Sequence, residues 1–181
     1  LCCHYRVSSK QGFIGLPEVN LGLLPGAGGT QRLPRLVGPA EALKIMLSGR
    51  HIPAVKALDM GVIDSLSEGD IVEDAVAFAK DVAEKNETHP LVRDLNEKVL
   101  AARGDENIIS EARALAAKTR KGQFAPGKII QCVEEAINLD DFDEGMKKEA
   151  EYFIECLVNP QREAMIHIFF GERAASKIND V

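Results

Sequence analysis

The chain of 181 residues contains no tryptophan, only 5% aromatic residues and no excess of positive charge. Its formal net charge of −6 argues against nucleic acid as the main partner, because an acidic protein repels a polyanion. A small anionic ligand stays compatible with this composition, since a few local cations can hold a phosphate. The basic residues form only short groupings such as Arg120-Lys121 and Lys147-Lys148.

The four cysteines and four histidines lack the spacing of a disulfide framework or a metal site. No CxxC pair, HExxH motif or nucleophile elbow occurs, which argues against zinc-protease and Ser-His-Asp chemistry. We therefore expect free thiols in a reducing compartment, no metal and no redox cofactor for this part of the protein. The residues concerned are Cys2, Cys3, Cys132 and Cys156, and His4, His51, His89 and His167.

Long apolar runs are also missing. None approaches the ~20 residues of a membrane span, and no signal peptide is visible. Apolar residues make up 45% and charged residues 28%, which is ordinary for a folded globular protein. Because the chain starts Leu-Cys-Cys-His without Met, we expect that it was cut from a larger protein or that its N-terminal part is missing.

Glycine and proline are concentrated in residues 14–38, and so many helix and strand breakers predict a tight, shaped loop. Before this segment, residues 5–13 include a short strand-like stretch. Within residues 14–38, Thr30 could cap a helix that begins near Gln31. The breakers are Gly15, Pro17, Gly22, Pro25, Gly26, Gly28 and Gly29, with Gly38 at the end.

The rest of the chain is predominantly helical in its pattern. Pro39 and Gly49 mark the start and the end of one helix, and a second short helix is expected over residues 53–61. Val62-Ile63 resembles a brief strand, and Asp70 opens a further helix. The pattern breaks at residues 86–91, so we predict two parts, residues 1–86 and residues 87–181.

Beyond this boundary the apolar residues recur at helical spacing in four segments, which predicts a small helical bundle. The first part has too few strand candidates for a stable sheet of its own, so we expect it to need partners outside this sequence. The predicted faces are Ile108, Ile109, Ala112, Leu115 and Ala116; Ile129, Ile130, Val133 and Ile137; Met146, Ala150, Phe153, Ile154 and Leu157; and Ala164, Met165, Ile168 and Phe169.

Glu18 is the first candidate for catalysis. It follows Pro17 among leucines and valine, and an apolar setting raises the pKa of a carboxyl group, which makes it a usable general acid near neutral pH. A solvated loop glutamate is the alternative. Gly26 to Gly29 resembles a phosphate cradle, but it is neither GxGxxG nor a Walker loop, so close backbone packing is an equal alternative.

Residues 14–38 read IGLPEVNLGLLPGAGGTQRLPRLVG, which resembles the signature of the enoyl-CoA hydratase/isomerase (crotonase) family. The resemblance continues through residues 42–49 and through ALDMGVI at residues 57–63. Later segments resemble the linker of multifunctional beta-oxidation enzymes, in which a 3-hydroxyacyl-CoA dehydrogenase half follows. These segments are QFAPGKIIQCVEEAI, EGMKKEAEYFIECL and FFGERAASK.

The resemblance implies an α/β fold: the C-terminal portion of a crotonase-like beta-beta-alpha superhelix followed by a mainly helical region. It implies hydration of trans-2-enoyl-CoA, with delta3-delta2 isomerisation as a second activity, and Glu18 as the proton donor to the alpha carbon. An acyl-CoA would be the substrate, and NAD would belong only to a dehydrogenase half downstream. A cytoplasmic location, or a peroxisomal one in a eukaryote, and a homo-oligomer are further expectations.

The same resemblance suggests which residues contact the substrate. Pro17 and the loop Gly26, Ala27, Gly28, Gly29 and Thr30 would shape the acyl-CoA site. Arg173 and Lys177 would lie near the charged part of the ligand. Phe169 is a further candidate contact, although the helical spacing of Phe169 and Phe170 is more typical of a core than of a ligand stack.

The family uses two carboxylates, and the second, with the amides of the oxyanion hole, belongs to segments that would precede Leu1. We therefore expect this 181-residue chain alone to be an impaired fragment. Two alternatives stay open at this point. One is a non-catalytic helical fragment that binds partner chains, and the other is a different acyl-CoA reaction on the same fold.

Overall fold

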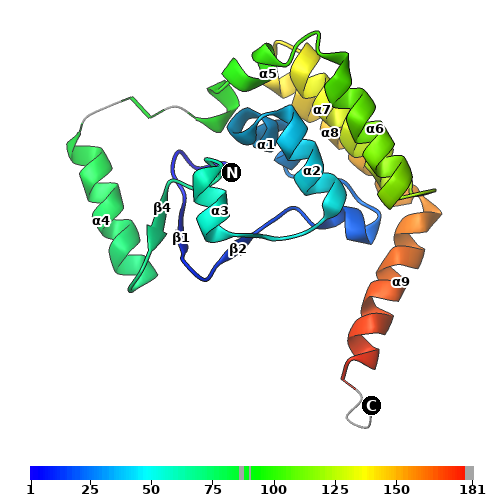
Figure 1. Ribbon diagram of the computed structural model, residues 1–181, viewed down its shortest axis with the longest axis horizontal. Coiled ribbons are helices and arrows are strands. Elements are labelled where there is room, and N and C mark those ends of the chain that lie inside the picture. Colours follow the sequence, from blue (N-terminus) through cyan, green and yellow to red (C-terminus); the bar gives the residue numbers. More distant parts are fainter. Residues whose placement is uncertain (86–87, 90, 178–181) are drawn as a thin grey trace.

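The computed structural model describes residues 1–85, 88–89 and 91–177, and helices dominate it (Figure 1). Two small sheets form near the N-terminus. Strand β1 (Val7–Ser9) pairs in parallel with β4 (Ser65–Ser67), with Val7 opposite Ser65. Strand β2 (Phe13–Ile14) pairs antiparallel with β3 (Ile52–Pro53).

The brief strand expected at Val62-Ile63 is wrong by two to three residues. Val62 and Ile63 are buried, at 1% and 4% exposure, and belong to the hydrophobic core. The ladder with β1 begins only at Ser65, after a turn that lets these two side chains point into the core. Their apolar character therefore reflects burial in that turn rather than strand pairing.

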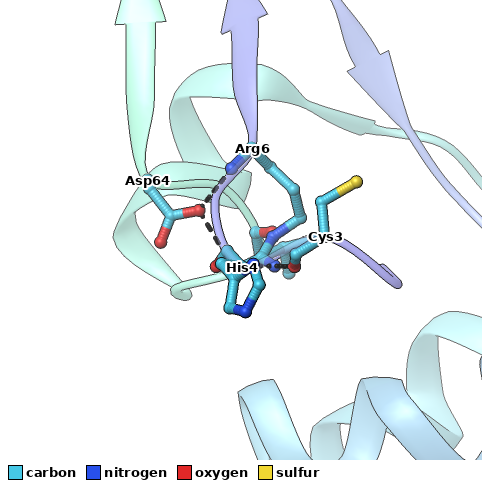
Figure 2. Close-up of polar contacts among 5 residues, drawn as sticks. Cys3, His4, Arg6 and Asp64 are labelled. Carbon is cyan, nitrogen blue, oxygen red and sulfur yellow. Dashed lines mark hydrogen bonds and ion pairs between the residues drawn. The ribbon is translucent and has the colours of Figure 1, made fainter. Parts of the chain in front are cut away.

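Arg6 joins β1 to this turn (Figure 2). Its backbone N–H donates to Asp64 Oδ2 at 2.7 Å, and its Nη2 lies 3.1 Å from the same oxygen. The guanidinium Nε donates to the carbonyl of Val62 at 2.6 Å, and Nη1 donates to the carbonyls of Cys3 at 2.9 Å and His4 at 3.4 Å. These contacts fix the turn that brings β4 alongside β1.

The first helical elements follow the sequence signals closely. They are the 3-10 turn η1 (Glu18–Leu21), α1 (Gly29–Val37), α2 (Pro39–Ser48) and α3 (Ala54–Asp59). The predicted start of α2 at Pro39 and its end at Gly49 are confirmed, and Gly49 adopts the left-handed conformation (φ 61°) that favours glycine there.

The predicted cap at Thr30 is wrong. Helix α1 begins at Gly29 after Gly28 (φ 83°), so Thr30 already lies inside the helix. Its hydroxyl donates to the carboxylate of Glu149 instead of capping its own helix. A tertiary contact has therefore replaced the local cap.

The later helices confirm the helical periodicity of the sequence. Asp70 is the N-cap of α4, and its side chain accepts hydrogen bonds from the backbone N–H groups of Val72 and Glu73. The elements are α4 (Ile71–Glu84), η2 (Val92–Asp94), α5 (Glu97–Ala101), α6 (Glu106–Thr119), α7 (Ala125–Asn138), α8 (Phe142–Val158) and α9 (Pro160–Ala175).

Helices α1, α2, α6, α7 and α8 pack into one cluster (Figure 1). Its core contains the apolar residues expected for α2 and α7, namely Leu43, Ile45, Met46 and Leu47, and Ile129, Ile130, Val133 and Ile137. The predicted boundary at residues 86–91 includes residues 86, 87 and 90, which lie outside those described. The division into residues 1–86 and 87–181 stays a prediction.

Helices α8 and α9 bury less of their apolar face than their sequences suggest. In α8, Ile154 and Leu157 are 59% and 40% exposed, because the helix turns Glu149 and Cys156 toward the core. None of the described residues of α4 and α9 is buried. Helix α4 packs on β1 and β4 apart from the cluster, and α9 extends away from it (Figure 1).

Candidate functional site

Glu18 is the first residue of η1 and lies directly after Pro17. The turn is closed by hydrogen bonds from the Asn20 N–H to the Pro17 carbonyl at 2.9 Å and from the Leu23 N–H to the Glu18 carbonyl at 3.1 Å. Gly22, at φ 71°, ends it. A single 3-10 turn has little stability of its own, so its position depends on tertiary contacts.

The carboxyl group of Glu18 is half-buried, and its Oε2 is buried without a hydrogen-bond partner among the described residues. Burial raises the pKa of this carboxyl group above its ordinary value of 4.5, and a backbone hydrogen bond opposes the shift. A carboxyl group with a raised pKa keeps its proton closer to neutral pH. Glu18 is therefore suited to proton transfer in a partly dry setting.

A network behind Glu18 holds η1 in place. Val19 is fully buried, and the side-chain amide of Asn20 donates to the carbonyl of Gly49 at 3.0 Å. From the other side, Nη2 of Arg120 donates to Oδ1 of Asn20 at 2.8 Å. The sequence patterns singled out neither Asn20 nor Arg120 for the site. Arg120 was noted only as half of the short basic pair Arg120-Lys121.

The glycine loop after η1 is occupied by a carboxylate of this same chain. The backbone N–H of Gly28 donates to Glu149 Oε1 at 2.6 Å, and the N–H of Thr30 donates to Oε2 at 3.1 Å. Glu149 is only 1% exposed. An anion at the N-terminus of α1 satisfies free N–H groups and interacts favourably with the helix dipole. Two of the loop's amides therefore face Glu149 rather than a ligand.

The pKa of Glu149 lies above its ordinary value of 4.5 because burial outweighs the hydrogen bonds from Thr30 and Gly28. Sequence reasoning missed this residue. The available signal was its spacing, since Glu149 lies three residues after Met146 and four before Phe153, on the predicted apolar face of α8. A lone carboxylate on such a face favours a buried partner.

Close packing shapes the rest of the loop. A Cβ atom on Gly26 would lie 2.3 Å from Cδ2 of Phe153, and one on Gly29 would lie 2.7 Å from Cβ of Pro25. Ala27 accepts a hydrogen bond from Nη1 of Arg32 at 3.2 Å. The glycines are therefore needed here for close approach to neighbouring side chains.

The other candidate contacts lie on or after α9, which packs against η1. A Cβ atom on Gly22 would lie 3.2 Å from Sδ of Met165, one turn before Phe169. Phe169 is half-buried under the guanidinium of Arg173, 4.9 Å from the ring centroid. Arg173 and Lys177 are exposed.

Phe169 and Phe170 form an edge-to-face pair with ring centroids 5.5 Å apart. Phe170 is 61% exposed and Phe169 only half-buried, so the expectation that they belong to the core is wrong. The reason is that α9 extends away from the helix cluster, so this part of the helix has few neighbours to bury it (Figure 1).

An apolar cavity of about 330 Å³ lies beside the segment that leads to Glu18. Residues 14–16 line one side of it, and Leu33 of α1 and Ile45 of α2 also border it. It is a hollow of low polarity whose lining includes Leu16, two residues before the candidate acid.

The four cysteines are free thiols, as expected. Cys132 and Cys156 are buried, and burial raises the pKa values of their thiols to about 12 and about 11. In the described part of the chain no group of three or more His, Cys, Asp or Glu residues could hold a metal ion. There too, no helix combines the length and apolar character needed to cross a bilayer.

A family model described as enoyl-CoA hydratase/isomerase matches residues 1–145. The chain belongs to the enoyl-CoA hydratase/isomerase family. This assignment agrees with the resemblance of residues 14–38. The Pro17-Glu18 turn thus belongs to a chain from a family of enzymes.

Curated relatives extend the match beyond residue 145. The chain is 39% identical over 179 residues to the peroxisomal bifunctional enzyme of Homo sapiens, covering 98% of the chain and 24% of that protein. It is 40% identical over 183 residues to the fatty acid oxidation complex subunit alpha of Shewanella sp. (strain MR-4), covering 98% of the chain and 25% of that protein. The chain thus spans about a quarter of the length of these relatives.

A solved structure confirms the fold. The crystal structure of carnitinyl-CoA hydratase from Mycobacterium avium matches with a TM-score of 0.58 at 21% identity, covering 93% of this chain and 52% of that one. The predicted architecture, the C-terminal portion of a crotonase-like fold that is mostly α in this segment, is therefore confirmed.

Proposed function

We propose that the protein containing this chain adds water to trans-2-enoyl-CoA in fatty-acid beta-oxidation, with Glu18 as the acid that protonates the alpha carbon. The observation that carries this proposal is the buried Oε2 of Glu18, which has a raised pKa and no hydrogen-bond partner among the described residues, in a chain of the hydratase/isomerase family. The names of the relatives point to the same pathway, since one is a subunit of a fatty acid oxidation complex.

The chemistry requires a proton at one carbon and hydroxide at the next. As a water oxygen bonds to the beta carbon, a base takes one of its protons, and the double-bond electrons move toward the thioester oxygen. Collapse of this enolate then takes a proton from Glu18 at the alpha carbon. Hydrogen-bond donors must stabilise the enolate oxygen meanwhile, and the family resemblance assigns both these donors and the base to segments outside this sequence.

The proposal extends to isomerisation, because the Glu18 carboxylate can take a proton from the alpha carbon of a 3-enoyl-CoA and return it to the gamma carbon of the resulting dienolate. Hydration changes no oxidation state overall, so it needs no NAD. We assign NAD only to a 3-hydroxyacyl-CoA dehydrogenase half downstream. A peroxisomal site in a eukaryote, or the cytoplasm in a bacterium, and self-association into a homo-oligomer complete the proposal.

The acyl-CoA site in this proposal lies between η1 and the glycine loop. Pro17 and residues 26–30 would shape its wall, and Phe169, Arg173 and Lys177 would contact the ligand from α9 and the residues after it. The packing of α9 on η1 supports this placement, because it brings the helix that carries Phe169 next to the turn of Glu18.

The test is hydration of crotonyl-CoA by the protein expressed from its natural start, wild type beside Glu18→Gln. We expect the wild type to turn over and the variant to lose about a hundredfold or more in kcat, because glutamine cannot donate the proton. Glu68→Gln, at an exposed residue paired with Lys10, is the matched control and should keep full activity. Equal turnover by Glu18→Gln would show that Glu18 is not the acid.

Migration of the double bond in a 3-enoyl-CoA is measured in the same preparations. We expect Glu18→Gln to lose this activity as well, since a glutamine amide can neither take a proton from the alpha carbon nor return it to the gamma carbon. A wild type that turns over neither substrate would retain the family fold and contradict the proposed reaction.

A further inference from the structure

Arg120 lies just after α6, far along the chain from the catalytic turn η1, yet its side chain bonds to a residue of that turn. Its backbone N–H caps α6 by donating to the carbonyl of Ala116 at 2.8 Å. Its guanidinium points to the end of α2, where Nε donates to the Leu47 carbonyl at 2.9 Å and Nη2 to the Ser48 carbonyl at 2.6 Å. These carbonyls carry the partial negative charge of a helix C-terminus, so a guanidinium is favourable there.

The same Nη2 atom also donates to Oδ1 of Asn20 at 2.8 Å. The amide nitrogen of Asn20 donates to the Gly49 carbonyl at 3.0 Å, so both ends of this amide are held. Asn20 lies two residues after Glu18 within one short turn. Any rotation of this turn would move both side chains together.

Space around the turn is limited as well. A Cβ atom on Gly49 would lie 2.7 Å from Nδ2 of Asn20 and 2.8 Å from Cγ1 of Val19. The turn thus packs directly against the end of α2, and Arg120 forms hydrogen bonds to both of them. Because η1 is a turn of four residues, these anchors rather than its own hydrogen bonds decide where Glu18 points.

We propose that Arg120 and Asn20 form a positioning pair that fixes the direction of the Glu18 carboxyl group for proton transfer. Arg120 acts through Asn20 and does not touch the substrate. The inference rests on the proposed function of Glu18 and extends it. It states that efficient proton transfer also requires Arg120, at the end of α6. A displacement of about 1 Å in a reacting group can lower the rate by about a hundredfold, so even partial release of the turn should be measurable.

The most selective variant is Asn20→Ala. It removes the link between Arg120 and η1 but leaves Arg120 bonded to the carbonyls of α2. In the protein expressed from its natural start, we expect kcat for crotonyl-CoA hydration to fall about tenfold while KM stays within about twofold. Arg120→Gln should show the same split, and Arg120→Lys, which keeps the charge but loses the planar fork, should lie between.

The double variant Asn20→Ala/Arg120→Gln tests whether the two residues act as a unit. If they do, its kcat should be no lower than that of the weaker single variant, because the second change removes a link already lost. If kcat of the double variant falls by the product of the two single-variant factors, the residues act independently, and the positioning pair is contradicted.

Arg103 provides the matched control. It closes the end of α7 in the same way, with Nε donating to the Ile137 carbonyl at 3.0 Å and Nη2 to the Asn138 carbonyl at 3.3 Å, but it does not bond to η1. Arg103→Gln should lower the thermal midpoint about as much as Arg120→Gln and leave kcat unchanged. A loss of kcat in Arg103→Gln equal to that in Arg120→Gln would mean that general destabilisation explains both.

The pH profile supplies a readout that stability alone does not move. Release of the turn admits water to Glu18 and lowers its pKa, so the pH at which kcat/KM falls on the alkaline side should shift downward in Asn20→Ala. Full kcat and an unshifted profile in both Asn20→Ala and Arg120→Gln would overturn the positioning role. If Glu18→Gln alone were fully active, the proposed function itself would fail, so the two failures are distinguishable.

Discussion

Glu149 on α8 accepts a hydrogen bond of 2.6 Å from the backbone N–H of Gly28, 121 residues earlier in the chain. The same carboxylate accepts bonds from the N–H and the hydroxyl of Thr30. A residue of the segment that resembles the beta-oxidation linker thus supplies the anion at the start of α1. The glycine loop of the family signature owes its shape to this later helix.

The first prediction concerns Glu149. Glu149→Leu leaves buried donors of Gly28 and Thr30 without an acceptor, and we expect it to lower the free energy of unfolding by on the order of 3 kcal/mol. Glu149→Gln keeps one acceptor oxygen and should lose less. Urea denaturation followed by circular dichroism measures both. Glu151→Gln, at an exposed position of the same helix, should change stability by less than about 0.5 kcal/mol.

A loss in Glu149→Leu no larger than that in Glu151→Gln would show that water reaches the loop and replaces the carboxylate. Such a result would contradict the burial of Glu149 at 1% exposure.

The second prediction concerns Gly26. Its Cβ position lies 2.3 Å from the ring of Phe153, so Gly26→Ala should destabilise the fold by roughly 1–3 kcal/mol through overpacking. Gly127→Ala is the matched control, since apart from its chain neighbours and the backbone of its own helix no atom of the described residues lies within 4 Å of a Cβ atom at this position in α7. That change should stabilise the protein by roughly 0.5–1 kcal/mol, because alanine loses less entropy in a helix.

Thermal unfolding of both variants checks the contrast. Adding Phe153→Leu to Gly26→Ala should recover part of the loss by making space. If the double variant is no more stable than Gly26→Ala alone, the ring is not the cause of the strain.

The third prediction follows from the raised pKa of Glu18. A carboxyl group whose pKa is higher in the folded than in the unfolded state stabilises the fold most when protonated. Its contribution is complete below the ordinary value of 4.5 and is lost as pH rises through the folded pKa. The free energy of unfolding of the wild type, relative to Glu18→Gln, should therefore decrease as the pH rises above 4.5.

Urea titrations of both proteins at several pH values measure this difference. A wild type that gains stability relative to Glu18→Gln as pH rises would show that Glu18 is stabilised as a carboxylate. Desolvation would then not be the dominant effect on its pKa.

Sequence reasoning predicted local features most accurately. Pro39, Gly49 and Asp70 act within a few residues of their own position, and the structure places helix ends at these residues as predicted. Thr30 failed as a cap because Glu149, distant in sequence, offers its hydroxyl a buried acceptor. Ile154 and Leu157 failed as core residues because helical spacing gives a face but not the direction in which that face turns.

The sequence alone determined the family, the helices and the choice of Glu18, because the motif of residues 14–38 is long and helix signals are local. Only the tertiary structure decided what surrounds Glu18 and the glycine loop. Arg120 and Glu149 are separated from their partners Asn20 and Gly28 by 100 and 121 residues. No local preference specifies such contacts, since they form only when packed helices bring the side chains together.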